Sequence, residues 1–71
     1  MGRPVKRSLT LRRHRTSVTL EDEFWQAFRD IAKAEGRALN DLAAEIDAER
    51  TQDTGLASAI RVYVLKHLHQ N

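Results

Sequence analysis

Three side chains at alternate positions, Arg15, Ser17 and Thr19, are of the types that hydrogen-bond to the edges of DNA bases. Arginine donates two hydrogen bonds to guanine, and serine or threonine bonds to several bases or touches the thymine methyl group. Residues 15–20 alternate in the manner of a half-buried strand, and alternate side chains of a strand share a face. The sequence therefore predicts a strand whose polar face could contact bases.

The opposite face of this strand carries Thr16, Val18 and Leu20, which we expect to pack on helices. Two alternatives stay open for the polar face. It could belong to an ordinary edge strand that is merely hydrated. Thr19 could also cap the next helix, because the four residues that start at Thr19 loosely match a capping box.

A single strand of six residues needs a partner for its backbone N–H and C=O groups, because orphaned groups are costly when buried. Two copies from two chains would pair antiparallel into a ribbon narrow enough for the DNA major groove. Residues 8–11 also alternate, so a hairpin with residues 12–14 as its connector is the second interpretation. It lacks an Asn-Gly or Asp-Gly turn signal, and the ribbon between two chains is therefore preferred.

The remainder of the chain predicts three helices, over residues 21–35, 39–50 and 56–69. Each has apolar residues at three-to-four spacing, which places them on one face. We expect Gly36 to end the first helix in the left-handed conformation, and a polar segment ending at Gly55 to separate the second helix from the third. The linear sequence gives no internal repeat and no low-complexity segment.

A chain of 71 residues is marginally stable as a monomer, and this one has no cysteine for a disulfide bond. Oligomerisation is the remaining way to enlarge the core. We therefore expect a homodimer. Its predicted core consists of Val18, Leu20, Phe24, Phe28, Ile31, Leu42 and Ile46.

The net charge of +2 is unevenly distributed. Residues 1–20 carry six Lys or Arg and no acid, whereas residues 21–71 carry six Lys or Arg and ten Asp or Glu. We expect residues 1–7 to be disordered, and residues 1–14 to form a basic arm that contacts a polyanion. A solvated tail without function is the alternative. The candidate phosphate contacts in the arm are Arg3, Lys6, Arg7, Arg12, Arg13 and His14.

The sequence offers no pattern typical of an enzyme, a cofactor site or a membrane span. It contains no nucleophile with a local base and no Gly-rich phosphate loop, so we expect no catalytic activity and no cofactor. His67 and His69 lie two residues apart, and such positions on a helix point to different sides, so we expect no metal site there. The basic N-terminus lacks the apolar segment of a signal peptide, and we expect a cytoplasmic, nucleoid-associated protein.

The run from Arg15 to Ile46 resembles the ribbon-helix-helix proteins, the Arc/MetJ class of bacterial DNA-binding proteins. The matching elements are the strand at residues 15–20, the helix that ends at Glu35-Gly36-Arg37, and Leu39-Asn40-Asp41-Leu42 at the start of the next helix. Residues 6–22 together with Ala59-Ile60-Arg61-Val62 are similar to a subfamily of small bacterial ribbon-helix-helix domain proteins.

The resemblance implies an intertwined homodimer whose strand pair enters the major groove. It implies that Arg15, Ser17 and Thr19 contact bases, and that the turn around Leu39 and Asn40 contacts phosphate, since a helix N-terminus has free N–H groups. Many relatives carry Ser or Thr where this chain has Ala38. The helix at residues 56–69 exceeds the minimal fold and could enlarge the dimer core or bind a second protein or another dimer.

The sequence thus predicts a mostly α, α+β fold with one short strand per chain. A ribbon-helix-helix core at residues 15–50 follows the basic arm, and the extra helix packs on it. The predicted function is dimeric, sequence-specific binding of double-stranded DNA, as a transcriptional repressor. The alternatives are an antitoxin of a toxin–antitoxin pair, and a protein-interaction module that does not bind DNA.

Overall fold

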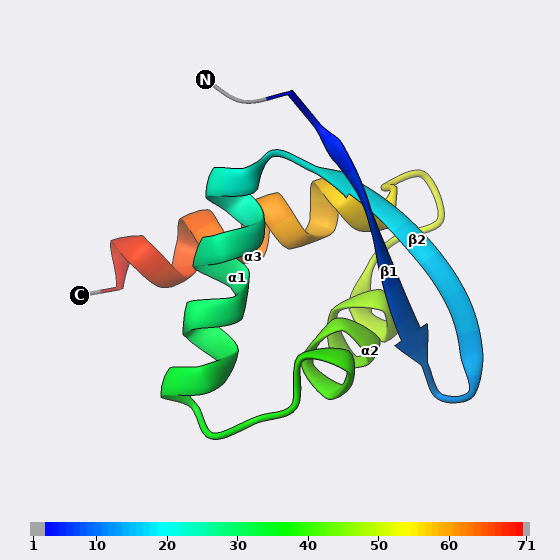
Figure 1. Ribbon diagram of the computed structural model, residues 1–71, viewed down its shortest axis with the longest axis horizontal. Coiled ribbons are helices and arrows are strands. Elements are labelled where there is room, and N and C mark those ends of the chain that lie inside the picture. Colours follow the sequence, from blue (N-terminus) through cyan, green and yellow to red (C-terminus); the bar gives the residue numbers. More distant parts are fainter. Residues whose placement is uncertain (1–2, 71) are drawn as a thin grey trace.

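The computed structural model describes residues 3–70 and shows a β-hairpin followed by three helices (Figure 1). The strands are β1 (Val5–Leu11) and β2 (His14–Leu20), and the helices are α1 (Asp22–Ala34), α2 (Leu39–Glu49) and α3 (Leu56–His69). The α+β class and the extra C-terminal helix are confirmed, and each helix begins and ends within one residue of its predicted range.

The prediction of one strand per chain is wrong. β2 pairs antiparallel with β1 of the same chain, so the partner expected from a second chain lies nine residues upstream. Residues 8–11 join the sheet, and the strand already begins at Val5, so residues 5–7 are ordered rather than disordered. The part of that expectation that concerns residues 1–2 lies outside the described residues.

The hairpin closes through a two-residue turn at Arg12 and Arg13, whose φ angles are 50° and 77°. Positive φ at both central residues is the type I′ geometry, whose twist matches that of the flanking strands. Asn and Gly favour this geometry, and arginine does not. The turn therefore forms without its usual sequence signal. For this reason the sequence favours pairing between two chains over the hairpin.

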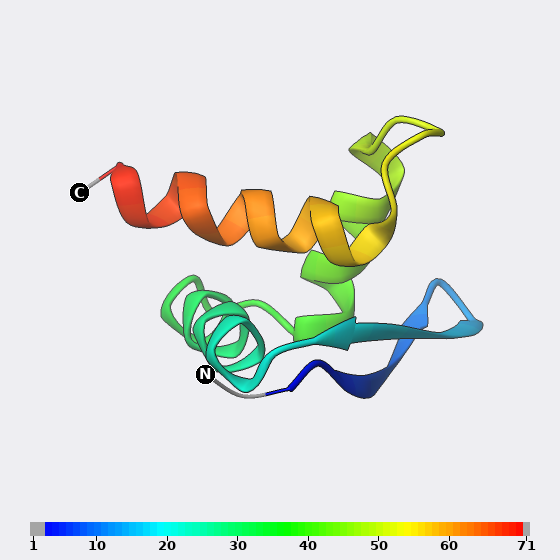
Figure 2. The same ribbon diagram turned by 90° about the horizontal axis from the view of Figure 1, so that it is seen from above.

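The core lies between the inner face of the hairpin and the three helices. Its largest fully buried side chains are Leu20, Phe28, Leu42, Ile60 and Val64. Seen from above, the hairpin runs along one side of the molecule and α3 along the opposite side (Figure 2). Of the residues predicted for a dimer core, Phe24 is partly buried and the other six are buried within this single chain.

The end of α1 follows the prediction for Gly36, whose φ is +66°. The N–H of Gly36 donates to the carbonyl of Lys33 at 3.0 Å, and the N–H of Arg37 donates to the carbonyl of Ala32 at 2.9 Å. These two bonds form a Schellman motif, which satisfies carbonyls that the helix leaves free. At the other end, the N-cap of α1 is Glu21 without a side-chain cap bond, so Thr19 does not cap this helix.

We predict that the hairpin can be locked within one chain by a disulfide bond between residues 8 and 17. These residues lie opposite each other, and directly opposed strand residues have Cα separations of about 4.5–5.5 Å, within the range of a disulfide. After oxidation, Ser8→Cys/Ser17→Cys should migrate as a monomer on a non-reducing gel and form a reducible internal cross-link. The chain has no other cysteine to compete. A double variant that forms cross-links only between chains, with no internal bond, would contradict the intrachain pairing.

Candidate nucleic-acid interface

The outward face of the hairpin presents six polar side chains. In an antiparallel pair, opposed residues point to the same face. The register therefore forms three outward pairs, Lys6 with Thr19, Ser8 with Ser17 and Thr10 with Arg15, and all six residues are exposed. The predicted base-contacting residues, Arg15, Ser17 and Thr19, thus lie together on one solvent-facing surface.

β1 contributes three residues to this surface that the sequence did not assign to base contact. Lys6 was expected to meet phosphate, and Ser8 and Thr10 had no predicted role. Their alternation with Arg7 and Leu9 is the signal that could have identified them, because it continues the pattern of residues 8–11 toward the N-terminus. Without a pairing partner for β1, that pattern did not show which face they would share.

The ribbon is basic along its length, since residues 3–20 include no Asp or Glu. Arg12 and Arg13 form its exposed tip in the left-handed conformation. That conformation costs an L-residue about 1–2 kcal/mol relative to the right-handed one. Backbone strain of this size clusters at functional sites. Two cationic side chains at the tip are suited to phosphate contact.

Arg7 lies on the inner side of the hairpin, apart from the other predicted phosphate contacts. Its Nη2 donates to Asp22 Oδ1, and its guanidinium lies 5.5 Å from the centroid of the Trp25 ring. Only 20% of its side chain is exposed. Arg7 therefore ties β1 to the first turn of α1.

The helices hold both outer edges of the ribbon at backbone groups. On the β1 edge, the N–H of Thr10 donates to Asn40 Oδ1 at 3.1 Å. On the β2 edge, Arg61 Nη2 donates to the carbonyl of Thr19 at 3.3 Å and to Glu21 Oε1 at 2.9 Å. These contacts come from α2 and α3, and they fix the ribbon relative to the helices.

Arg61 joins α3 to the start of α1. Its guanidinium lies 5.8 Å from the centroid of the Phe24 ring, within the range of a cation–π interaction. The pKa of Glu21 is lowered, first by a hydrogen bond from its own backbone and then by the hydrogen bond from Arg61. Both bonds favour the ionised carboxylate, so the ion pair is formed at neutral pH.

The N-terminal turn of α2 lies beside the β1 edge, because the Asn40 side chain reaches Thr10. The Leu39 side chain is partly buried against the core, so only its backbone could serve the predicted phosphate contact. The first turn of a helix has N–H groups without helical partners, which suits an anion. Arg3 is exposed just before β1, and His14 is exposed where β2 begins.

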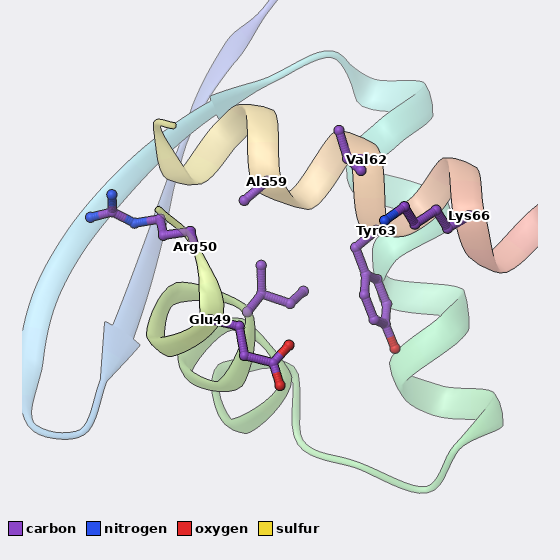
Figure 3. A pocket seen from close by; sticks show the side chains of 7 residues that line it. Glu49, Arg50, Ala59, Val62, Tyr63 and Lys66 are labelled. Carbon is purple, nitrogen blue, oxygen red and sulfur yellow. The ribbon is translucent and has the colours of Figure 1, made fainter. Parts of the chain in front are cut away.

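A hollow lies away from the ribbon face, between the C-terminal end of α2 and α3 (Figure 3). Glu49 and Tyr63 lie on opposite sides of it, and Val62 and Lys66 lie along its α3 side. Val62 also belongs to a set of exposed apolar side chains on α3, with Leu65 and Leu68.

No group of three or more His, Cys, Asp or Glu side chains within residues 3–70 is arranged to hold a metal ion. None of the helices in that part of the chain has the length and apolar character needed to cross a membrane.

A protein-family model described as a ribbon-helix-helix domain matches residues 4–68, which is most of the chain. The chain therefore belongs to the ribbon-helix-helix domain family. Members of this family are typically DNA-binding transcription regulators or antitoxins. Comparison with curated proteins and comparison with solved structures gave no match.

We predict that Arg12→Asn/Arg13→Gly stabilises the fold and weakens DNA binding. Asn and Gly adopt the type I′ turn with less strain, so the free energy of unfolding should rise by on the order of 1 kcal/mol. Each lost phosphate contact should reduce the log–log salt slope of DNA binding by about 0.9. Thermal melting and binding titrations at several salt concentrations measure the two effects.

The matched control for the turn is Arg12→Lys/Arg13→Lys, which keeps both positive charges at the tip. It should retain the salt slope of the unaltered protein. An Asn-Gly variant with an unchanged salt slope would contradict a phosphate-contacting role for the tip.

Proposed function

We propose that this protein is a homodimeric, sequence-specific DNA-binding protein that represses transcription, and that its β1–β2 ribbon enters the major groove. The observation that carries the proposal is the outward face of the ribbon, where six exposed hydrogen-bonding side chains lie on two strands that contain no Asp or Glu. The major groove is about 12 Å wide and admits a two-stranded ribbon. The inner face of the same ribbon packs on the helices, which leaves the outer face available.

The residues divide into two groups by the part of DNA that they would contact. The outward residues of both strands contact the base edges. Arg15 is the strongest candidate, because arginine donates hydrogen bonds to two atoms of guanine. The phosphate contacts are Arg3, Arg12, Arg13, His14 and the backbone N–H groups at Leu39 and Asn40. Phosphate contacts position the protein and base contacts supply its sequence preference.

Arg7 has a different role in this proposal. Its side chain is held by Asp22 and Trp25, so it orients β1 on α1 instead of binding phosphate. Its positive charge still contributes to the potential of the basic end of the molecule.

A protein-binding role is the second candidate, and the exposed side chains Val62, Leu65 and Leu68 favour it. They lie on α3, which is on the opposite side of the molecule from the ribbon (Figure 2). An antitoxin would use both surfaces, with DNA on the ribbon and its toxin on α3. A pure interaction module would use α3 alone and would give no shift of duplex DNA at low salt.

We predict that Arg15→Ala weakens binding to the preferred DNA sequence by about 1–3 kcal/mol, the worth of one bidentate base contact. Fluorescence anisotropy with the preferred duplex and with a random duplex measures the loss. Affinity for random DNA should fall much less, because phosphate contacts supply it.

The control for Arg15→Ala is Lys66→Ala, which removes the same charge from α3, away from the ribbon. It should leave the preference between the two duplexes unchanged. Equal losses in the two variants would show a general charge effect and would contradict base contact by Arg15.

A further inference from the structure

The two strands of the hairpin repeat one another in sequence. Residues 6–11 read Lys-Arg-Ser-Leu-Thr-Leu, and residues 15–20 read Arg-Thr-Ser-Val-Thr-Leu. At an offset of nine residues, Ser, Thr and Leu are identical at three positions, a fourth position is apolar in both, and the first position is a cation in both. This similarity was not identified as an internal repeat in the sequence analysis. The unit is only six residues long, far below the usual periods of repeat proteins.

The pairing register converts this repeat into a two-fold relation. Ser8 lies opposite its own repeat equivalent, Ser17. A two-fold axis that passes between them, perpendicular to the ribbon, therefore superimposes each residue of one repeat on its equivalent in the other. On the outward face it exchanges Lys6 with Arg15 and Thr10 with Thr19. All outward residues thus belong to pairs of like chemistry.

The helices hold the ribbon at equivalent points. Thr10 and Thr19 exchange under the axis, and Asn40 contacts the backbone of the first while Arg61 contacts the backbone of the second. On the inner face, the equivalent residues Leu9 and Val18 are both buried. The relation is broken there by Arg7, which is held by Asp22, whereas its equivalent Thr16 is exposed.

The ends of the outward face are separated by a distance that matches DNA. Lys6 and Arg15 lie at opposite ends of the ribbon, four residues apart along its length, because Lys6 pairs with Thr19 and Arg15 with Thr10. At about 3.4 Å per residue this is about 14 Å. The same length corresponds to about four base-pair steps of 3.4 Å. Both lysine and arginine can bond to O6 and N7 of guanine.

We infer that a single chain reads a short pseudo-palindromic subsite, with one guanine on each DNA strand about four base pairs apart. Lys6 contacts one guanine and Arg15 the other, while the serine and threonine side chains lie over the base pairs between them. The inference rests on the proposed DNA binding and extends it. A ribbon assembled from two chains would read one such subsite per dimer, whereas this ribbon is complete within each chain, so a dimer reads two.

The experiment is selection of bound sequences from a random duplex pool with the full chain, followed by the same selection with Lys6→Ala and Arg15→Ala. Each variant should lose the guanine preference at one end of the subsite, and the two ends should be related by the pseudo-palindrome. Affinity for the selected duplex should fall by about 5- to 150-fold in each variant. Lys6→Arg should restore the preference, and Lys66→Ala should not alter it.

Stoichiometry provides an independent measurement. Native mass spectrometry of the complex with a duplex that contains two subsites should give one dimer, that is, one chain per subsite. Four chains on that duplex, two for each subsite, would overturn the inference. Both exposed positions tolerate alanine without loss of packing, and thermal melting of each variant checks that it is folded.

The outcomes separate the inference from the proposed function. If the sequence preference of the protein depends on Arg15 but not on Lys6, the inference that the two residues contact the two ends of one subsite is overturned. Sequence-specific DNA binding would remain intact. The absence of any enriched sequence, together with no shift of duplex DNA at low salt, would overturn the proposed function itself.

Discussion

The hydrogen-bonded pairing of β1 with β2 is the interaction on which the rest of this structure depends. It gives the strand at residues 14–20 a partner within its own chain and so satisfies backbone groups that would otherwise need a second molecule. It also decides which side chains face the core, because a slip of one residue would exchange the two faces of a strand. With Ser8 opposite Ser17, the apolar side chains Leu9, Leu11, Val18 and Leu20 turn inward together.

The helices orient the ribbon through a small number of polar contacts. Asn40 and Arg61 bind backbone groups on opposite edges of the ribbon, and Arg7 anchors β1 through Asp22 and Trp25. These contacts leave the outward side chains free, because they use main-chain atoms and one inward residue. The basic surface is therefore presented by a strand pair that is bonded to the helices at both edges, which favours contacts of defined geometry with a ligand.

Much of the fold could be predicted from local patterns. The three helices follow from apolar spacing, the end of α1 follows from Gly36, and the shared face of Arg15, Ser17 and Thr19 follows from alternation. The partner of the strand was predicted wrongly, because Arg12 and Arg13 form a type I′ turn without the residues that usually signal it. The role of Arg7 was missed for a related reason: its partners, Asp22 and Trp25, are distant in sequence.

The sequence by itself determined the three helices and the polar face of the strand, because each depends on residues within a few positions of one another, and the charge asymmetry can be counted directly from the sequence. Only the tertiary structure decided that Lys6, Ser8 and Thr10 join that face, and that Asn40 and Arg61 hold its edges. Those facts depend on which segments meet in space. A two-residue turn with positive φ angles brings the two strands together, and the short motif that first indicated DNA contact thereby becomes half of a two-stranded surface.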